Sequence, residues 1–274
     1  MKYFLLILIL WEILGCVNQA ETSKISLPSN TIPPSSYESV PLRWESSKIP
    51  LTMNISENFS ADEKQKMEEM QFEWNNSGAG QTFFSGVNPA VPNKALTYLE
   101  DYYDNEFGIY KLTTWFDEIG EDALAVTQFF AKRHNVGTPS EFLEIVHVDI
   151  LFNNKNFNFA TDGSFSKYDL PSIALHELGH VLGLKHERAH DSIMYPYLSS
   201  GTLKRSLKPF DIESIGELYG NFIPSSLNIA RSALKTLPQD EGKIVRGIVE
   251  ISASGKEKIY FLNFPTKDFT KNIK

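Results

Sequence analysis

The 274-residue sequence predicts a mixed fold of class α+β, with one twisted sheet, three helices and a small C-terminal extension. Hydrophobic residues make up 42% of the chain, enough for one sizeable core. Segments rich in aromatic and β-branched residues cluster over 81–152, and segments with helical spacing of apolar residues flank them. The formal net charge of -8 and the lack of a lysine- or arginine-rich run exclude a nucleic-acid-binding protein.

Residues 1–15 predict a signal peptide. An apolar run over 3–14, interrupted by Glu12, is too short for a membrane-spanning helix, which needs about 20 residues. The run ends in "ILGC", which resembles the bacterial lipobox, where cleavage precedes an acylated cysteine. Cys16 is the only cysteine, so an intrachain disulfide and a zinc site of several thiolates are excluded. An ordinary signal peptide with an incidental cysteine is the alternative.

Residues 16–40 are expected to form a lipid-anchored tether, because the Ser- and Pro-rich segment 21–40 is too polar to pack. The expected location is the bacterial cell envelope, with the protein exported and anchored to a membrane, facing the outside or the periplasm. Secretion is the alternative.

The main domain is expected over 41–222, and it begins with a strand because apolar residues alternate over 49–55. Ser60 and Glu63 then form a capping box for the first helix. The apolar face of this helix comprises Met67, Met70 and Trp74. Further strands are predicted in "QTFF" (81–84), "IYKLTTWF" (109–116), "ALAVTQFF" (123–130) and "FLEIVHVDILF" (142–152).

Two more helices complete the predicted domain. Asp169 as a cap and Pro171 in the first turn begin the second. The third begins near Pro209, ends at Gly220, and has Ile212, Ile215 and Tyr219 on one face. The extension over 223–274 suggests a short helix (Leu227, Ala230 and Leu234) and a β-hairpin that turns at Gly255 and packs on the main domain.

The stretch "HELGHVLGLKH" predicts a metal site. His176 and His180 are four residues apart, so on a helix they lie about 6 Å apart on one face and can reach one ion at about 2.0–2.1 Å. His186 can join them only if the helix ends first, and Gly183 is suited to end it. Three neutral nitrogens with an open fourth position are typical of catalytic zinc. Chance would produce this spacing at a frequency on the order of 10⁻⁴.

Glu177 supplies the second part of the chemistry. It lies next to a ligand but points about 100° away around the helix, so it should stay outside the coordination shell. It can reach a zinc-bound water, whose pKa falls to about 7 in such sites, and it can pass the proton to a leaving amine. These parts suffice for peptide hydrolysis without a covalent intermediate.

Together with Met194 in "SIMYPY", eight residues beyond His186, the histidine motif resembles the metzincin metallopeptidases, and among them the matrixins, the matrix-metalloproteinase family. The resemblance covers roughly 41–220. It implies a twisted, mostly parallel, five-stranded sheet, a cleft above the active-site helix and a small subdomain beneath it. It also implies zinc ligands His176, His180 and His186, the general base Glu177, and Met194 as an apolar floor that does not bind the metal.

The resemblance further implies where substrate binds. Tyr195, Pro196 and Tyr197 would line the pocket for the side chain after the cleaved bond. "ALAVTQ", which contains Ala125, would be an edge strand that accepts substrate as an added strand.

Three departures from the family pattern stand out. Glu187 occupies a position where matrixins usually have serine, which keeps an astacin-like protease as an alternative. The cysteine-containing propeptide motif that keeps relatives latent is absent. Asp149 matches a metal-binding position and suggests a calcium ion, whereas a structural zinc lacks a partner histidine because Val126 stands there.

The sequence therefore predicts a zinc-dependent endopeptidase that acts on extracellular or surface proteins, with protein or peptide substrates and Zn²⁺ as its cofactor. A surface-anchored binding protein with an inactive metzincin fold is the alternative from another class, but it would not need Glu177. A different zinc hydrolase is disfavoured by Met194.

Overall fold

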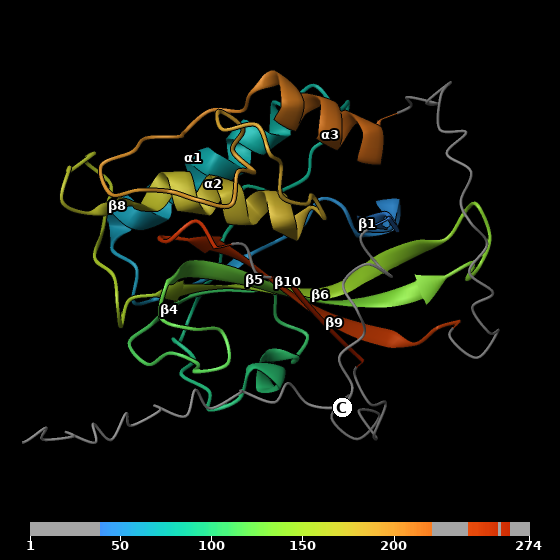
Figure 1. Ribbon diagram of the computed structural model, residues 1–274, viewed down its shortest axis with the longest axis horizontal. Coiled ribbons are helices and arrows are strands. Elements are labelled where there is room, and N and C mark those ends of the chain that lie inside the picture. The colour runs from blue at the N-terminus through green and yellow to red at the C-terminus, as the bar shows by residue number, and fades with distance from the viewer. Residues whose placement is uncertain (1–38, 221–240, 257–258, 264–274) are drawn as a thin grey trace, which may run out of the picture.

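The computed structural model describes residues 39–220, 241–256 and 259–263 (Figure 1). The predicted signal peptide, Cys16, nearly all of the tether and the short helix expected around Ala230 lie outside the described residues. The strands are β1 (Leu42–Arg43), β2 (Asn54–Ser56), β3 (Ala90–Val91), β4 (Gly108–Leu112), β5 (Ala123–His134), β6 (Phe142–Asn153), β7 (Phe159–Ala160), β8 (Tyr168–Asp169), β9 (Ile244–Ser252) and β10 (Ile259–Asn263). The helices are α1 (Ala61–Asn75), α2 (Leu170–Val181) and α3 (Pro209–Tyr219), with 3-10 turns at Ser46–Lys48 and Leu99–Tyr102.

A central sheet organises the fold, with the strand order β10-β9-β5-β6-β4-β2-β3 and β1 also paired to β6. The pairings of β6 with β1 and β4, and of β2 with β3 and β4, are parallel, whereas β5 pairs antiparallel with β6 and β9, as does β9 with β10. The predicted class, a mostly parallel sheet with three helices, is confirmed. Among the described residues this sheet has eight strands, not the five expected, because the strand expected over 81–84 does not form whereas two very short strands, β1 and β3, and the two strands of the C-terminal hairpin join the sheet.

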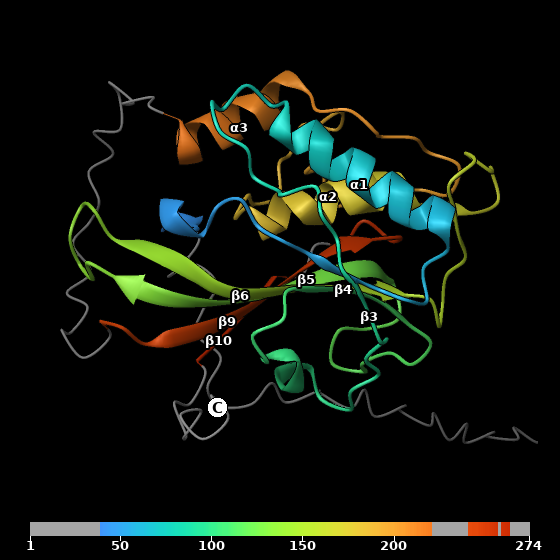
Figure 2. The same ribbon diagram turned by 180° about the vertical axis from the view of Figure 1, so that it is seen from behind.

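The three helices cover one face of this sheet, as the two opposite views show (Figures 1 and 2). The predicted capping box at Ser60 and Glu63 is present at the start of α1. On the same helix Trp74 is fully buried and its indole N–H donates a 2.9 Å hydrogen bond to the carbonyl of Leu175 in α2. On α3, Ile215 is buried but Ile212 is 44% exposed, so the predicted apolar face of that helix is narrower than expected.

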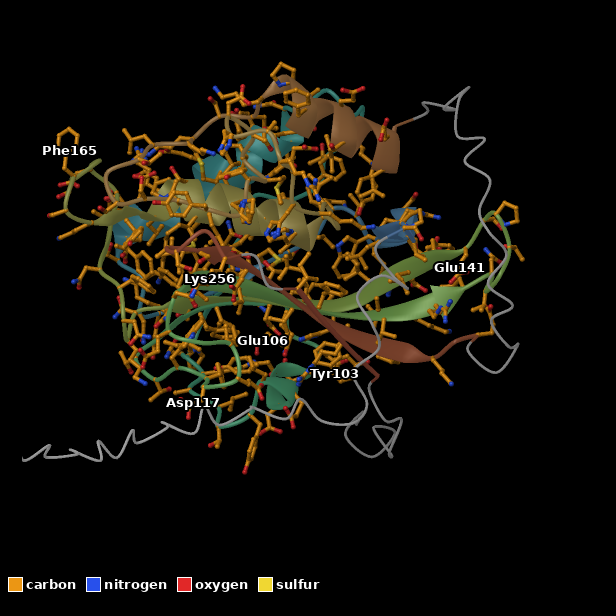
Figure 3. All side chains as sticks on the ribbon, viewed as in Figure 1. Tyr103, Glu106, Asp117, Glu141, Phe165 and Lys256 are labelled. Carbon is orange, nitrogen blue, oxygen red and sulfur yellow. The ribbon has the colours of Figure 1, made fainter. Side chains whose placement is uncertain are left out.

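A second, smaller hydrophobic cluster lies on the other face of the sheet. It includes Tyr102, Tyr110, Trp115, Val126 and Ile248, so the central strands are buried on both faces. The side chains of Tyr103, Glu106 and Asp117 lie on this side, away from the helices (Figure 3). Within the described residues, no helix is long and apolar enough to cross a membrane.

The strand predicted over 81–84 does not form, apart from one bridge between Leu51 and Phe84. The side-chain oxygen of Asn75 accepts hydrogen bonds from the backbone N–H groups of Phe83 (2.8 Å) and Phe84 (2.9 Å). A side chain at the end of α1 thus satisfies backbone donors that a neighbouring strand would otherwise pair.

The C-terminal hairpin is present, but its position corrects one prediction. The resemblance implies an edge strand at "ALAVTQ", whereas β5, which contains this segment, is paired with β6 on one side and with β9 on the other. An open strand edge leaves N–H and C=O groups without partners, and here the chain's own C-terminal part pairs with them. In Figures 1 and 2 the red strand β9 runs along β5 and passes beneath α2.

Candidate active site

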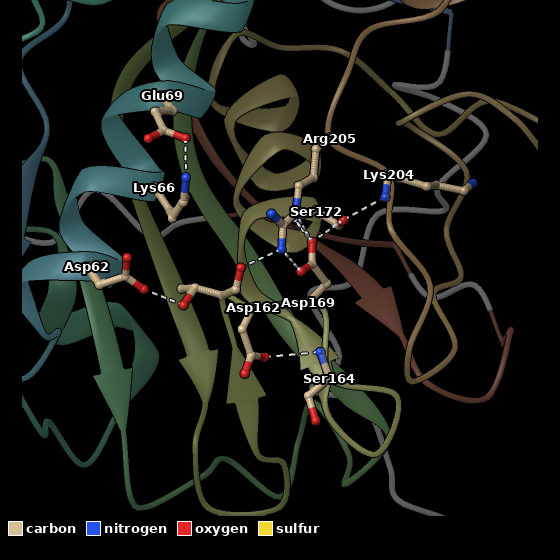
Figure 4. Close-up of polar contacts among 10 residues, drawn as sticks. Asp62, Lys66, Glu69, Asp162, Ser164, Asp169, Ser172, Lys204 and Arg205 are labelled. Carbon is tan, nitrogen blue, oxygen red and sulfur yellow. Dashed lines mark hydrogen bonds and ion pairs between the residues drawn. The ribbon is translucent and has the colours of Figure 1, made fainter.

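The helix that carries the histidine motif is anchored at its start. The Asp169 carboxylate accepts hydrogen bonds from the backbone N–H of Ser172 (3.0 Å) and from the Arg205 guanidinium, and the backbone N–H of Lys204 donates to the Ser172 hydroxyl at 2.7 Å (Figure 4). Pro171 lies in the first turn, as predicted. Every residue of α2 is buried, so its polar side chains need partners inside the protein.

The helix also ends where the sequence predicts. It stops at Val181, and Gly183 has a positive φ of 92°. A Cβ atom at Gly183 would lie 2.0 Å from the backbone oxygen of Leu42, so only glycine fits there. The turn brings His186 back toward the helix.

The three predicted ligands come together. One ring nitrogen from each of His176, His180 and His186 lies within 4.8 Å of the other two. The Nδ1 of His176 is 2.7 Å from the backbone oxygen of Ile193, and the Nδ1 of His180 is 2.8 Å from that of Leu184. A carbonyl oxygen can only accept, so each Nδ1 carries the proton and each Nε2 has a lone pair.

Those two Nε2 atoms are 2.9 Å apart, although neither carries a proton to share. Burial lowers the pKa of His176 and of His180 well below 6.5, and the neighbouring imidazoles lower it further. Both rings are therefore neutral at pH 7, the state that binds a metal ion. Lone pairs that face each other at this distance are stabilised by a cation between them, and three imidazole nitrogens suit zinc.

Glu177 follows His176 on α2, and among the described residues it is not part of a group of side chains that could hold a metal ion. Its Oε2 accepts a 2.6 Å hydrogen bond from the hydroxyl of Thr127 in β5, and the backbone of Ile251 in β9 lies nearby. Complete burial raises the pKa of Glu177 to about 8, the nearby charge of Glu250 adds to this, and the hydrogen bond from Thr127 and the nearby backbone of Ile251 oppose it. A cation among the imidazoles would favour the charged carboxylate.

Met194 packs directly against α2. It is 1% exposed, and a Cβ atom at Gly179 would lie only 2.4 Å from its sulfur. Asp211 of α3 holds the segment just before Met194 in place. Its carboxylate accepts hydrogen bonds from the Ser192 hydroxyl (2.6 Å) and from the backbone N–H of Ile193 (3.2 Å). Ile193 in turn orients His176. Neither Asp211 nor Thr127 was predicted from the sequence, and an acid in the first turn of a helix was the only local signal for Asp211.

Three of the four predicted pocket residues lie along β9. Ala125 pairs with Ile251, the carbonyl of Pro196 accepts a 3.0 Å hydrogen bond from the backbone N–H of Ser252, and Tyr197 bridges to the same Ser252. Tyr195 lies elsewhere, with its ring centroid 4.3 Å from that of His190. The pocket assignment stays a prediction.

The structure gives Asp149 partners that do not suit calcium. One carboxylate oxygen accepts from the backbone N–H of Gly108 (2.9 Å) and the other lies 2.7 Å from the Nε2 of His147. Calcium takes six to eight oxygen ligands, whereas the His147 ring lies among the rings of Tyr103, Phe107 and Phe130. Burial raises the pKa of Asp149 to about 6, and the hydrogen bond with His147 opposes this.

Comparison with known proteins agrees with this geometry. Residues 56–220 match the family described as Matrixin. The chain is 32% identical over 109 residues to Metalloendoproteinase 4-MMP of Arabidopsis thaliana, covering 39% of this chain and 32% of that protein. It is 52% identical over 52 residues to Metalloendoproteinase 5-MMP of the same plant, covering 19% and 14%. It is 30% identical over 140 residues to a Putative matrix metalloproteinase of Trichoplusia ni ascovirus 2c, covering 47% and 24%.

The matched part of the chain thus spans about a seventh to a third of the length of these relatives. The family match is longer than any of these alignments and extends over more than half of the chain, including the whole histidine site. This protein belongs to the matrixin family.

Proposed function

We propose that this protein is a zinc-dependent endopeptidase that cleaves extracellular or surface proteins, with Glu177 as its general base. One observation carries the proposal: Glu177 directly follows His176 on α2, stays outside the group of three convergent imidazoles, and has its carboxylate held by the Thr127 hydroxyl. A group in this position can exchange protons with a reacting molecule at the triad.

Each residue of the site has its own role in the proposed reaction. His176, His180 and His186 would hold zinc, which supplies Lewis-acid chemistry for the peptide carbonyl and for water. Glu177 accepts the proton of the attacking water and delivers it to the leaving nitrogen. The carbonyls of Ile193 and Leu184 keep the rings of His176 and His180 in their ligating orientation.

The alternative, a binding protein with an inactive fold, has no use for a base held in this way.

The proposed location of the protein depends on residues near the N-terminus, outside the described residues. We propose that the protein is exported and lipid-anchored through Cys16, which the apolar run and "ILGC" at the N-terminus support.

The decisive test compares Glu177→Gln with Glu68→Gln, an exposed glutamate on α1 that serves as the matched control. Zinc content is measured by atomic emission and cleavage by release of fluorescent peptides from labelled casein. We expect about one zinc per chain in all proteins, loss of cleavage on chelation, and a loss of at least about 10³-fold in Glu177→Gln alone. Equal cleavage by Glu177→Gln would show that Glu177 is not the base.

Because β9 pairs with β5, the strand expected to bind substrate, the same measurements are made in a Gly247→Ala background. An added Cβ at position 247 would meet the ring of Phe129 at 2.0 Å and loosen β9.

A further inference from the structure

We infer that residues 244–253 of this chain occupy its own substrate cleft and hold the enzyme latent. The inference rests on the proposed function and concerns the regulation of that site.

Main-chain hydrogen bonding holds β9 on both sides. On one side β9 runs antiparallel to β5, with Ile251 opposite Ala125 and Val249 opposite Thr127. On the other side, Ser252 donates its backbone N–H to the carbonyl of Pro196 (3.0 Å) and accepts at its own carbonyl from the N–H of Leu198 (3.2 Å). An extended peptide that adds to a sheet edge is bound in this way, with main-chain pairing that does not depend on its side chains.

The register places β9 at the reactive centre. Val249 of β9 lies opposite Thr127, whose hydroxyl donates to the Glu177 carboxylate, and the Glu250–Ile251 peptide bond follows one residue later in β9. The Ile251 backbone and the Glu250 carboxylate lie close enough to the proposed base to shift its pKa in opposite directions. Glu250 is 0% and Ile251 2% exposed, so both residues of this part of β9 are packed inside the protein. A protein substrate cannot pair with β5 or reach Glu177 until β9 leaves.

Covalent attachment makes β9 a strong competitor. A tethered segment acts at an effective concentration in the millimolar range, well above that of a typical protein substrate. Two contacts outside the cleft add to the attachment: β10 pairs with β9, and Arg246 forms an ion pair of 3.0 Å with Glu100. Displacement or cutting of this hairpin would then activate the enzyme.

Gly247 allows a test away from the catalytic residues. It lies opposite Phe129, and a Cβ atom at position 247 would approach the ring of Phe129 to 2.0 Å. Gly216 in α3 is the matched control, because a Cβ atom there meets nothing within 4 Å. We expect Gly247→Ala to raise kcat/KM for a fluorescent peptide at least about 10-fold and Gly216→Ala to leave it unchanged. Amide hydrogen exchange in β9 reports whether the strand has been released, and Gly247→Trp is used if alanine is accommodated.

A disulfide that holds β9 on β5 and can be reduced tests the same inference, because it should inhibit the enzyme where release of β9 should activate it. Lys132 and Ile244 are paired and half-buried, and Lys132 lies five residues beyond Thr127, about 17 Å along the strand. In a Cys16→Ser background with Gly247→Ala, Lys132→Cys with Ile244→Cys should form a disulfide that ties β9 to β5. Oxidation should lower kcat/KM at least about 10-fold, and reduction should restore it. The single variant Lys132→Cys should respond to neither.

The outcomes separate the two proposals. Wild type and Gly247→Ala that cleave equally fast, although exchange shows β9 released, would overturn the inhibitory strand and leave the endopeptidase intact. A released strand without any Glu177-dependent cleavage would instead remove the proposed function. Oxidation of the double-cysteine variant without loss of activity would also count against the inhibitory strand.

Discussion

The Thr127 hydroxyl donates a 2.6 Å hydrogen bond to the Glu177 carboxylate, and both side chains are fully buried. Thr127 belongs to β5 and Glu177 to α2, so this contact ties the sheet to the active-site helix. The residue that orients the proposed base thus comes from the strand that pairs with β9. Strand β5 therefore both pairs with β9 and, through Thr127, orients the proposed base Glu177.

Removal of this hydrogen bond should impair catalysis without removal of the metal. Thr127→Val keeps the shape of the side chain but loses the donor, and a hydrogen bond to a charged group contributes about 1.5–3 kcal/mol. We expect kcat to fall about 10- to 100-fold at unchanged zinc content, with Thr127→Ser close to wild type. Steady-state kinetics in the Gly247→Ala background provides the measurement. Full activity of Thr127→Val would mean that Glu177 needs no such support.

Close packing of α2 on Met194 should make Gly179 intolerant of substitution. A Cβ atom there would lie 2.4 Å from the Met194 sulfur and 2.9 Å from the Trp74 ring. We expect Gly179→Ala to lower the free energy of unfolding by about 1–3 kcal/mol, as overpacked cores do. The helical control Gly216→Ala, which meets no neighbour, should raise it by up to about 1 kcal/mol. Urea unfolding measures the free energy of unfolding of both variants. Equal changes in Gly179→Ala and Gly216→Ala would contradict the packing argument.

Asp149 should make stability depend on pH. Its pKa is raised to about 6 from 3.8, chiefly by burial, so between these values the folded protein binds more protons than the unfolded chain. The free energy of unfolding therefore falls as the pH rises from about 4 to 6, by up to about 3 kcal/mol. Asp149→Asn has no carboxylate to ionise and should lose this dependence, so its stability relative to wild type should increase across the same window.

Urea unfolding of both proteins at pH 4, 5, 6 and 7 measures this difference, and ionisable groups that the two proteins share and that do not contact Asp149, as His147 does, cancel in the comparison. A constant difference across the four pH values would show that Asp149 keeps its charge throughout.

The proposed lipid anchor depends on the single cysteine. In a bacterial host, wild type should incorporate a clickable palmitate analogue and fractionate with membranes, whereas Cys16→Ser should do neither. Because Cys16 lies outside the catalytic domain, the variant should retain cleavage activity. A secreted, unlabelled wild type would favour the ordinary signal peptide.

The local parts of this protein could be predicted from its sequence. Helix geometry places His176 and His180 on one face, the caps at Ser60 and Asp169 begin their helices, and Gly183 ends α2 where predicted. Each of these features depends on residues within a few positions of one another, and backbone geometry over that range is determined by local sterics and hydrogen bonding.

Tertiary structure alone decided the rest. Thr127 meets Glu177 across 50 residues of chain, Asn75 replaces the strand partner expected at 81–84, and β9 covers the edge of β5. A strand edge can accept any extended segment, so the pattern of β5 predicts that it will pair but not with which segment. Its partner depends on which segment reaches the edge and buries both of its faces there, and this is a property of the whole folded chain.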